Sequence, residues 1–153
     1  PRHIDRIERI KSELEKLNLK TCLYSKFDEI NVKTDILLID AYGESSKFFS
    51  IAKYVFLGGS LIKHGGQNPI EPSRLGCKIF HGPNIDNFFE IYEYLKSLKI
   101  ANQIYNSEEL NQSLVEEFKL GKVDNNQIIE KIDNYGKNIL NNVINDLKKY
   151  INI

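Results

Sequence analysis

The sequence predicts an α/β fold in which helices cover a doubly wound parallel sheet. Short runs of consecutive apolar residues recur along the chain, as at 36–39 and 54–57, and such runs are typical of strands buried on both faces of a sheet. Segments between these runs have apolar residues at three- and four-residue steps, which is typical of amphipathic helices. Short strands that alternate with helices favour a parallel sheet.

The expected elements follow one another in a regular order. The first helix is indicated by Ile4, Ile7, Ile10, Leu14 and Leu17, which form one apolar face. Continuous apolar runs indicate the strands, and helical spacing indicates the later helices. In chain order we expect a helix at 4–17, strands at 21–24 and 36–39, a helix at 43–52, a strand at 54–57, a helix beginning near 69 or 71, a strand at 78–80, a helix at 87–98, a weak strand at 100–105, and helices at 107–120 and 125–150.

Some of these helices have further signals at their ends. Asn68 precedes Pro69, so we expect Asn68 to cap a helix whose first position is Pro69. Ser107, followed by Glu108 and Glu109, indicates another helix start. The last thirty residues are rich in Asn and Lys, and they predict a long surface helix that packs back on the domain.

The composition predicts one ordinary globular domain. The chain has 153 residues, of which 41% are hydrophobic and 27% charged, and this length supports a single sizeable core. Twenty-one Lys and Arg balance twenty-one Asp and Glu, so neither nucleic acid nor a polybasic membrane contact is expected. Cys22 and Cys77 lie far apart in apolar surroundings, and we interpret them as buried small hydrophobes rather than a disulfide or metal ligands.

The beginning of the sequence indicates a part of a longer protein. The chain opens on Pro1 rather than on Met, and no secretory signal peptide is recognisable. Its apolar runs are shorter than the roughly 18 residues that a membrane-spanning helix needs. We therefore expect residues 1–153 to form one soluble domain of a larger polypeptide.

Glycine-rich and polar loops follow three of the predicted strands. In doubly wound sheets, ligands bind beyond the carboxyl ends of the strands, where loops meet helix starts. The loops in this position are residues 40–44, 58–60 and 81–84. These loops are therefore the first candidates for a binding site.

The segment from Gly58 to Pro72 is the most informative. Its two Gly-Gly pairs leave backbone amides bare and let a ligand approach closely. Free amides at the helix start near Pro69 favour a phosphate or a carboxylate, and Glu71 has the oxygens to accept hydrogen bonds from a ribose diol. The alternative is a pair of tight turns before an ordinary capped helix, but the whole string favours ligand binding.

Two further candidates lie earlier in the chain. Gly43 permits close backbone approach, and Glu44 in the first turn of a helix suits the helix dipole; the alternative is a helix start with a stabilising acid. Arg2 would follow a strand that lies upstream of the sequence, and its guanidinium suits a phosphate or carboxylate. The alternative for Arg2 is a solvated surface arginine.

At these residues the sequence resembles the C-terminal domain of the 3-deoxy-D-manno-octulosonic acid (Kdo) transferases, the lipid A glycosyltransferases of Gram-negative bacteria. Five loops agree with the family in order and spacing over roughly the first ninety residues. The remainder of the chain carries the helical pattern but no motif. The matching strings are Pro1-Arg2-His3, Gly43-Glu44, Gly58-Gly59-Ser60, Gly65-Gly66, Asn68-Pro69-Ile70-Glu71-Pro72, and Gly82-Pro83 with Asn87-Phe88.

The resemblance implies a Rossmann-like domain, the C-terminal half of a two-domain GT-B glycosyltransferase, that holds the donor CMP-Kdo. It places the catalytic Glu in an N-terminal acceptor domain outside this sequence, together with membrane contact and the site for a lipid A precursor. It therefore implies no catalytic residue, no metal and no cofactor in this chain, and a complete protein at the cytoplasmic face of the inner membrane. The implied CMP contacts are Pro1, Arg2, Tyr42, Gly43, Glu44, Asn68, Pro69, Ile70 and Glu71.

The sequence departs from the family pattern at three positions. Tyr42, Gln67 and Asn84 stand where members often have Met, His and His, respectively. The change at Tyr42 is harmless if the contact is made by the backbone, whereas the other two argue against a direct sugar contact from Gln67 or Asn84. His64 and His81 have the chemistry of acid–base catalysts, but the resemblance requires His at neither position.

Two other functions stay open at this point. One is a GT-B relative that uses a UDP-sugar, which competition between CMP and UDP would distinguish. The other is a non-catalytic nucleotide-binding or partner-binding module, or the remnant of a split gene. A nicotinamide-binding domain is not expected, since no Gly-x-Gly-x-x-Gly follows the first strand.

Overall fold

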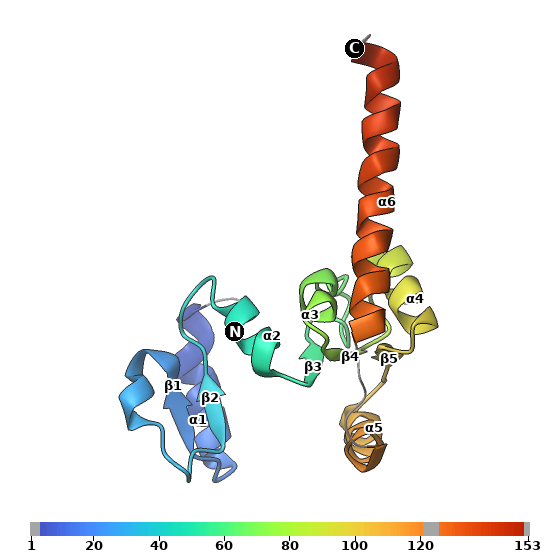
Figure 1. Cartoon of the computed structure of the whole chain (residues 1–153). Coiled ribbons are helices and arrows are strands. Elements are labelled where there is room, and N and C mark those ends of the chain that lie inside the picture. The colour runs from blue at the N-terminus through green and yellow to red at the C-terminus, as the bar shows by residue number, and fades with distance from the viewer. Residues whose placement is uncertain (1–3, 121–125, 152–153) are drawn as a thin grey trace. The chain divides into compact units, whose positions relative to one another are not determined.

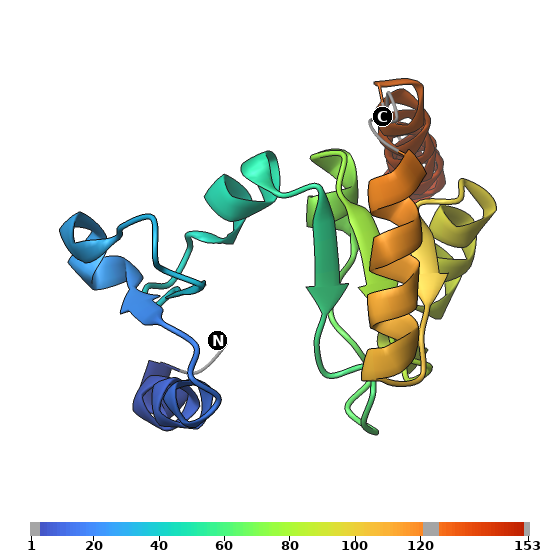
Figure 2. The same cartoon turned by 90° about the horizontal axis from the view of Figure 1, so that it is seen from below.

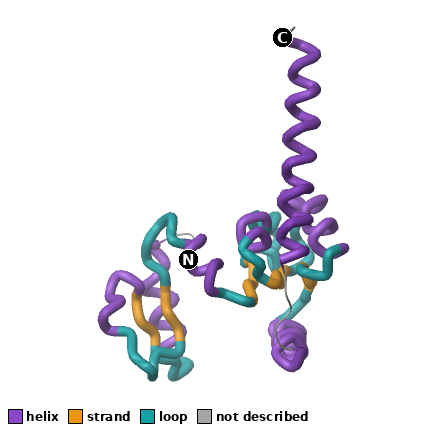
Figure 3. Tube along the Cα trace, in the orientation of Figure 1, coloured by secondary structure: helices purple, strands orange, loops and turns teal. Residues whose placement is uncertain are grey.

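The computed structural model describes residues 4–120 and 126–151. Its contacts divide the chain into two compact units, Pro1–Lys47 and Phe48–Ile153. Figure 1 labels the helices and strands, and Figure 3 shows how loops separate them. The expectation of one domain over residues 1–153 stays a prediction.

The first unit contains a small parallel sheet that follows an α-helix. Strands β1 and β2 pair in parallel, with Cys22 opposite Leu37. Ile7, Cys22 and Leu38 are buried in this unit. The elements are the 3₁₀ helix η1 (Ile4–Arg6), α1 (Ile7–Lys16), β1 (Thr21–Leu23), the 3₁₀ helix η2 (Tyr24–Glu29) and β2 (Ile36–Leu38).

The second unit contains a three-stranded parallel sheet in the order β3-β4-β5. Helix α2 (Ser45–Ile51) leads into this unit from the first. In the register of the sheet, Leu57 lies opposite His81, and His81 lies opposite Gln103. The further elements are β3 (Tyr54–Leu57), α3 (Ile70–Arg74), β4 (Lys78–His81), the 3₁₀ helix η3 (Asp86–Phe88), α4 (Phe89–Ser97), β5 (Ala101–Gln103), α5 (Ser107–Leu120) and α6 (Asn126–Ile151).

Helices cover both faces of the three-stranded sheet, with α5 along one face and α3 and α4 on the other (Figure 2). Successive side chains of a strand point to opposite faces. On the α5 side, the ring of Tyr54 meets that of Phe118 edge-on at a centroid distance of 5.0 Å. On the same side, Lys78 Nζ lies 2.9 Å from a carboxylate oxygen of Glu117.

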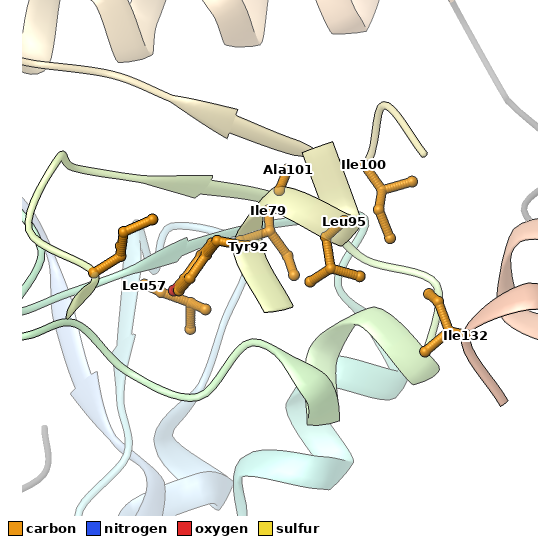
Figure 4. Close-up of a cluster of buried hydrophobic side chains, with 8 residues drawn as sticks. Leu57, Ile79, Tyr92, Leu95, Ile100, Ala101 and Ile132 are labelled. Carbon is orange, nitrogen blue, oxygen red and sulfur yellow. The ribbon is translucent and has the colours of Figure 1, made fainter. Parts of the chain in front are cut away.

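The main hydrophobic core lies on the opposite face, between the sheet and α4 (Figure 4). Ile79 of the central strand is fully buried at 0% exposure, and Tyr92 and Leu95 of α4 are each 1% exposed. This core fixes the spacing between the sheet and α4. Its buried members are Leu57, Ile79, Ile85, Tyr92, Leu95, Ile100, Ala101 and Ile132.

The predicted α/β class, the parallel pairing and the helices on both sides of a sheet are confirmed. Strand β3 and helix α5 have the predicted bounds, 54–57 and 107–120. The other four strands differ from the predicted bounds by one or two residues at an end, and the strands form two hydrogen-bonded sheets, one in each unit.

The C-terminal helix corrects another prediction. Ile128 and Ile132, near the start of α6, pack against the core of the second unit. Residues 136–151 are all exposed, and α6 extends away from the sheet (Figure 1). The prediction that this helix packs back on the domain therefore holds for the beginning of α6 alone. The later turns of α6 are not covered by another described element of this unit. In the part of the chain that the structure describes, no helix combines the length and apolarity needed to cross a membrane.

Candidate functional site

The nine residues that the sequence predicts as CMP contacts fall into three groups. Pro1 and Arg2 lie outside the described residues. Tyr42–Glu44 follow β2 in the first unit, and Asn68–Glu71 lie between β3 and the first turn of α3 in the second unit. The last two groups therefore belong to different units.

Glu44 lies directly before α2, and two neighbours hold its carboxylate. Tyr24 Oη donates a hydrogen bond to it at 3.3 Å, and Lys47 Nζ lies 2.6 Å away. The hydrogen bond from Lys47 lowers the pKa of Glu44 below its usual range. At neutral pH, Glu44 is therefore a carboxylate at the start of the helix, while Tyr42 beside it is 73% exposed.

A second carboxylate joins the loops that follow β1 and β2. Asp40 accepts a hydrogen bond from the backbone N–H of Ser25 at 2.8 Å and another from the Ser25 hydroxyl. The bond from the hydroxyl lowers the pKa of Asp40. Sequence reasoning did not single out Tyr24 or Ser25, and the signal that would have found them is their position at the carboxyl end of the predicted strand 21–24.

In the second unit, Ser60 joins the loops that follow β3 and β4. Its hydroxyl donates to the carbonyl of Leu57 at 2.6 Å and accepts the backbone N–H of Gly82 at 2.8 Å. Its carbonyl accepts from the backbone N–H of Asn84 at 2.9 Å and from Asn84 Nδ2 at 3.0 Å. Three of these four hydrogen bonds therefore connect two loops that are more than twenty residues apart in sequence.

Glycines let a third segment approach these loops. A Cβ on Gly82 would lie 2.3 Å from the carbonyl oxygen of Ser60, and a Cβ on Gly66 would lie 3.1 Å from that of Asn84. A Cβ on Gly65 would lie 2.3 Å from Asn87 Nδ2. We call residues 58–60, 65–67 and 82–84 the loop cluster.

Tyr92 supports the loop cluster from the core. Its hydroxyl donates to the carbonyl of Gln67 at 2.9 Å, and its side chain is 1% exposed. Burial raises the pKa of Tyr92 to about 12, so the hydroxyl keeps its proton and stays a donor. Because Gln67 immediately precedes Asn68, this bond anchors the chain next to the predicted contact residues.

The start of α3 differs from the prediction. The helix begins at Ile70 rather than at Pro69, and Asn68 Oδ1 accepts the backbone N–H of Ile70 at 3.0 Å. This amide is therefore bonded rather than open to a ligand, and the five-residue helix contributes little dipole. Pro69 is buried, whereas Asn68, Ile70 and Glu71 are exposed. What this segment offers a ligand is exposed side chains.

A cavity of about 370 Å³ lies in the same unit, between α3, α4 and α6. Its lining includes Ile70, Ile91, Leu95, Ile132 and Leu140, which are mainly apolar helix residues. Among the predicted contact residues with a described position, Ile70 alone lines it. The cavity therefore lies beside the core helices and is not formed by the loop cluster.

His81 is a neutral, buried histidine at the end of β4. It is 2% exposed, its ring centroid lies 4.3 Å from that of Tyr92, and Nδ1 donates to the carbonyl of Gly82 at 2.7 Å. Burial lowers the pKa of His81, an effect that the bond to Gly82 opposes. Nearby, Lys96 lowers this pKa further and Glu93 raises it.

Acid is therefore expected to destabilise the chain through His81. The unfolded histidine titrates near about 6.5, and the folded one titrates lower, so the unfolded chain binds more protons between the two pKa values. Stability is then complete above the unfolded pKa and falls as the pH drops towards the folded pKa, by at most about 1.4 kcal/mol per pH unit for this one proton. Urea unfolding at several pH values from 7.5 to 5.5 measures this slope.

Two histidine variants distinguish the proton taken up by His81 from protons taken up by other groups. His81→Gln is expected to flatten the slope, whereas His64→Gln, at an exposed histidine, is expected to leave it unchanged. The carboxylates of Asp40 and Glu44 have lowered pKa values, so they titrate below this pH range. An unchanged slope in His81→Gln would contradict the assignment.

The described residues contain no group of three or more His, Cys, Asp or Glu that could hold a metal ion. Cys22 and Cys77 are both buried and unpaired with each other, as predicted. Cys77 Sγ lies 3.2 Å from the carbonyl of Phe49, inside the core of the second unit. That the function needs neither a metal nor a cofactor stays a prediction.

Comparisons with known proteins place the chain among glycosyltransferase relatives. No family model matches it. The 3-deoxy-D-manno-octulosonic acid transferase of Haemophilus influenzae is 28% identical over 140 residues, which are 92% of this chain and 32% of the relative. The transferase of the same name from Rickettsia prowazekii is 30% identical over 151 residues, which are 99% of this chain and 31% of the relative. The chain thus spans about a third of the length of these curated relatives.

A solved structure has the same fold. The crystal structure of the C-terminal CMP-Kdo binding domain of WaaA from Acinetobacter baumannii matches with a TM-score of 0.73 at 23% identity, over 92% of this chain and 70% of that one. The GT-B C-terminal fold that the sequence predicts is confirmed by this match. The resemblance carried by the loop motifs is also confirmed: in sequence, this chain is a relative of the 3-deoxy-D-manno-octulosonic acid transferases.

Proposed function

We propose that this chain binds CMP-Kdo and, within a longer polypeptide, supplies the donor site for transfer of Kdo to a lipid A precursor. The observation that carries the proposal is the loop cluster at the carboxyl ends of β3 and β4, followed directly by Asn68–Glu71. Ligands of such sheets bind at this edge. The similarity in fold to a CMP-Kdo binding domain supports CMP-Kdo as the ligand.

The chemistry of the predicted contacts fits a nucleotide. Glu71 offers an exposed carboxylate that suits the two hydroxyls of a ribose. Arg2, one of the two most N-terminal candidates, has the guanidinium that suits the phosphate of CMP. In the first unit, Gly43 is exposed and, being glycine, leaves its backbone without a side chain beside the Glu44 carboxylate.

The remaining steps of the reaction belong to the proposal as well. The catalytic Glu, the acceptor site for the lipid A precursor and the contact with the inner membrane are assigned to a separate N-terminal domain. The chain by itself is then a donor-binding domain without transfer activity. The relatives that carry the transferase name are about three times as long as this chain, which supports this division of labour.

Binding of CMP to the chain tests the proposal directly. Isothermal titration calorimetry is expected to detect weak binding of CMP, and an excess of UDP is expected not to displace it. Glu71→Gln is expected to weaken CMP binding by about tenfold or more, because a hydrogen bond to a charged group contributes about 1.5–3 kcal/mol. Arg2→Ala is expected to weaken it similarly.

Glu116→Gln is the matched control. Glu116 is an exposed glutamate on α5, outside all three predicted contact groups, and its replacement is expected to leave CMP affinity unchanged. Equal affinity in the unaltered chain and in Glu71→Gln would remove Glu71 from the site. Displacement of CMP by equimolar UDP would favour a UDP-sugar donor instead.

A further inference from the structure

Ser60 is a buried residue that the predicted CMP contacts do not include. It is 0% exposed, so its side chain has no access to a ligand. Its hydroxyl has both a donor and an acceptor partner inside the protein, because the proton goes to the carbonyl of Leu57 and a lone pair accepts the N–H of Gly82. Any effect of Ser60 on a ligand must therefore act through the backbone that it holds.

The positions of its partners show what Ser60 holds. Leu57 is the last residue of β3, and Gly82 is the first residue after β4. These two strands are neighbours in the sheet, with Leu57 opposite His81. One hydroxyl thus joins the carboxyl ends of two adjacent strands, which is the edge where ligands of such sheets bind.

Direct contacts continue from Ser60 to the start of α3. The carbonyl of Ser60 binds both nitrogens of Asn84, and the backbone of Asn84 lies so close to Gly66 that even a Cβ there would lie 3.1 Å from the Asn84 carbonyl oxygen. Gln67 follows, with its carbonyl held by Tyr92, and Asn68 comes next in the chain. The loop cluster is therefore a packed connection from Ser60 to the predicted contact residues.

We propose that Ser60 is a positioning residue for the nucleotide: by locking the loop after β3 to the loop after β4, it sets the placement of Asn68–Glu71 for the ligand. The inference rests on the proposed function. It predicts that loss of the hydroxyl leaves a folded chain whose contact segment is displaced. Because the hydroxyl is the link, its deletion lowers affinity without removing any atom that touches the ligand.

Ser60→Ala tests this inference with CMP as the probe. Calorimetry is expected to show CMP affinity reduced by about fivefold to tenfold, since one hydrogen-bonded link contributes on this scale. Amide NMR spectra without ligand are expected to show shifts at Gly82 and Asn84 that extend to Asn68 and Glu71. This extension is the signature that a merely local structural role would not produce.

A control and a second variant keep the test decisive. Ile100→Val shortens a buried core side chain that belongs to the same unit but not to the loop cluster, and its CMP affinity is expected to stay within about twofold of the unaltered chain. If Ser60→Ala does not fold, Asn84→Ala removes another hydrogen bond between the same two loops, from Asn84 Nδ2 to the Ser60 carbonyl, at a half-buried position. This variant is expected to weaken CMP binding as well.

The possible failures are distinguishable. If the unaltered chain binds CMP and the folded Ser60→Ala variant, or Asn84→Ala in its place, binds equally well, Ser60 is not a positioning residue and the proposed function stands. If the unaltered chain does not bind CMP, the proposed function fails and the inference fails with it. Weakened binding by Ile100→Val to the same extent as by Ser60→Ala would also overturn the inference.

Discussion

Replacing Gly82 by Ala is expected to lower the free energy of unfolding by about 3 kcal/mol, the upper end of the usual cost of overpacking. The new Cβ would lie 2.3 Å from the carbonyl oxygen of Ser60, 2.5 Å from its carbonyl carbon and 2.6 Å from the nitrogen of Leu61. All three are backbone atoms, so no side chain rotation relieves the overlap. Separating the loops would also break the bonds between Ser60 and its partners. Urea unfolding followed by circular dichroism measures the loss.

Gly136 provides a control of the opposite sign. It lies within α6, and a Cβ there would meet nothing within 4 Å. Gly136→Ala is therefore expected to raise the free energy of unfolding by about 0.5–1 kcal/mol, because Ala is the better helix former. If Gly82→Ala were as stable as the unaltered chain, the close approach of the two loops would be wrong.

Replacing Gly65 by Ala is expected to lower the free energy of unfolding by about 2 kcal/mol, the sum of a backbone cost and a partly relievable overlap. The backbone of Gly65 has a φ of 80°, which costs a residue with a side chain about 1 kcal/mol or more. The new Cβ would also lie 2.3 Å from Asn87 Nδ2. Asn87 is exposed, so its side chain is able to move aside at a smaller cost than the backbone at Gly82.

A double-mutant cycle with Asn87→Ala separates the two costs. Shortening Asn87 removes the atoms that the new Cβ would meet but leaves the φ of Gly65 unchanged. The double variant is therefore expected to be more stable than the sum of the single changes predicts, by about 0.5–1 kcal/mol, with the backbone cost remaining. Simple additivity of the two changes would show that Asn87 does not limit the space at Gly65.

The two glycine predictions concern the structural role of the motifs that carry the family resemblance. Gly65-Gly66, Gly82-Pro83 and Ser60 belong to the motifs that carry the resemblance, yet their contacts are with other parts of the protein. Asn68–Glu71 follow in the same motif and are largely exposed. We therefore read the motif as two parts, one that builds the loop cluster and one that stays exposed beside it.

Local pattern alone predicts much of the fold. The apolar run Tyr54–Leu57 and the capped amphipathic segment Ser107–Leu120 have the observed bounds, because each pattern is a property of neighbouring residues. The order of strands and helices also predicts parallel pairing, since parallel strands need a crossover. The glycine-rich strings and their spacing predict the family resemblance that sequence comparison confirms.

Tertiary structure alone decides how the candidate site is built. The bond from Ser60 to Gly82 spans 22 residues and that from Tyr92 to Gln67 spans 25, and no local pattern reports such a pair. The exposed distal half of α6 is likewise invisible to periodicity, since an apolar stripe has the same spacing whether or not a partner covers it. The sequence by itself determined the elements and the loops that carry the motif. Packing between distant segments decided which motif residues are buried and which are exposed. The physical reason is that the burial of a residue depends on every segment that packs around it, including segments far away in the sequence.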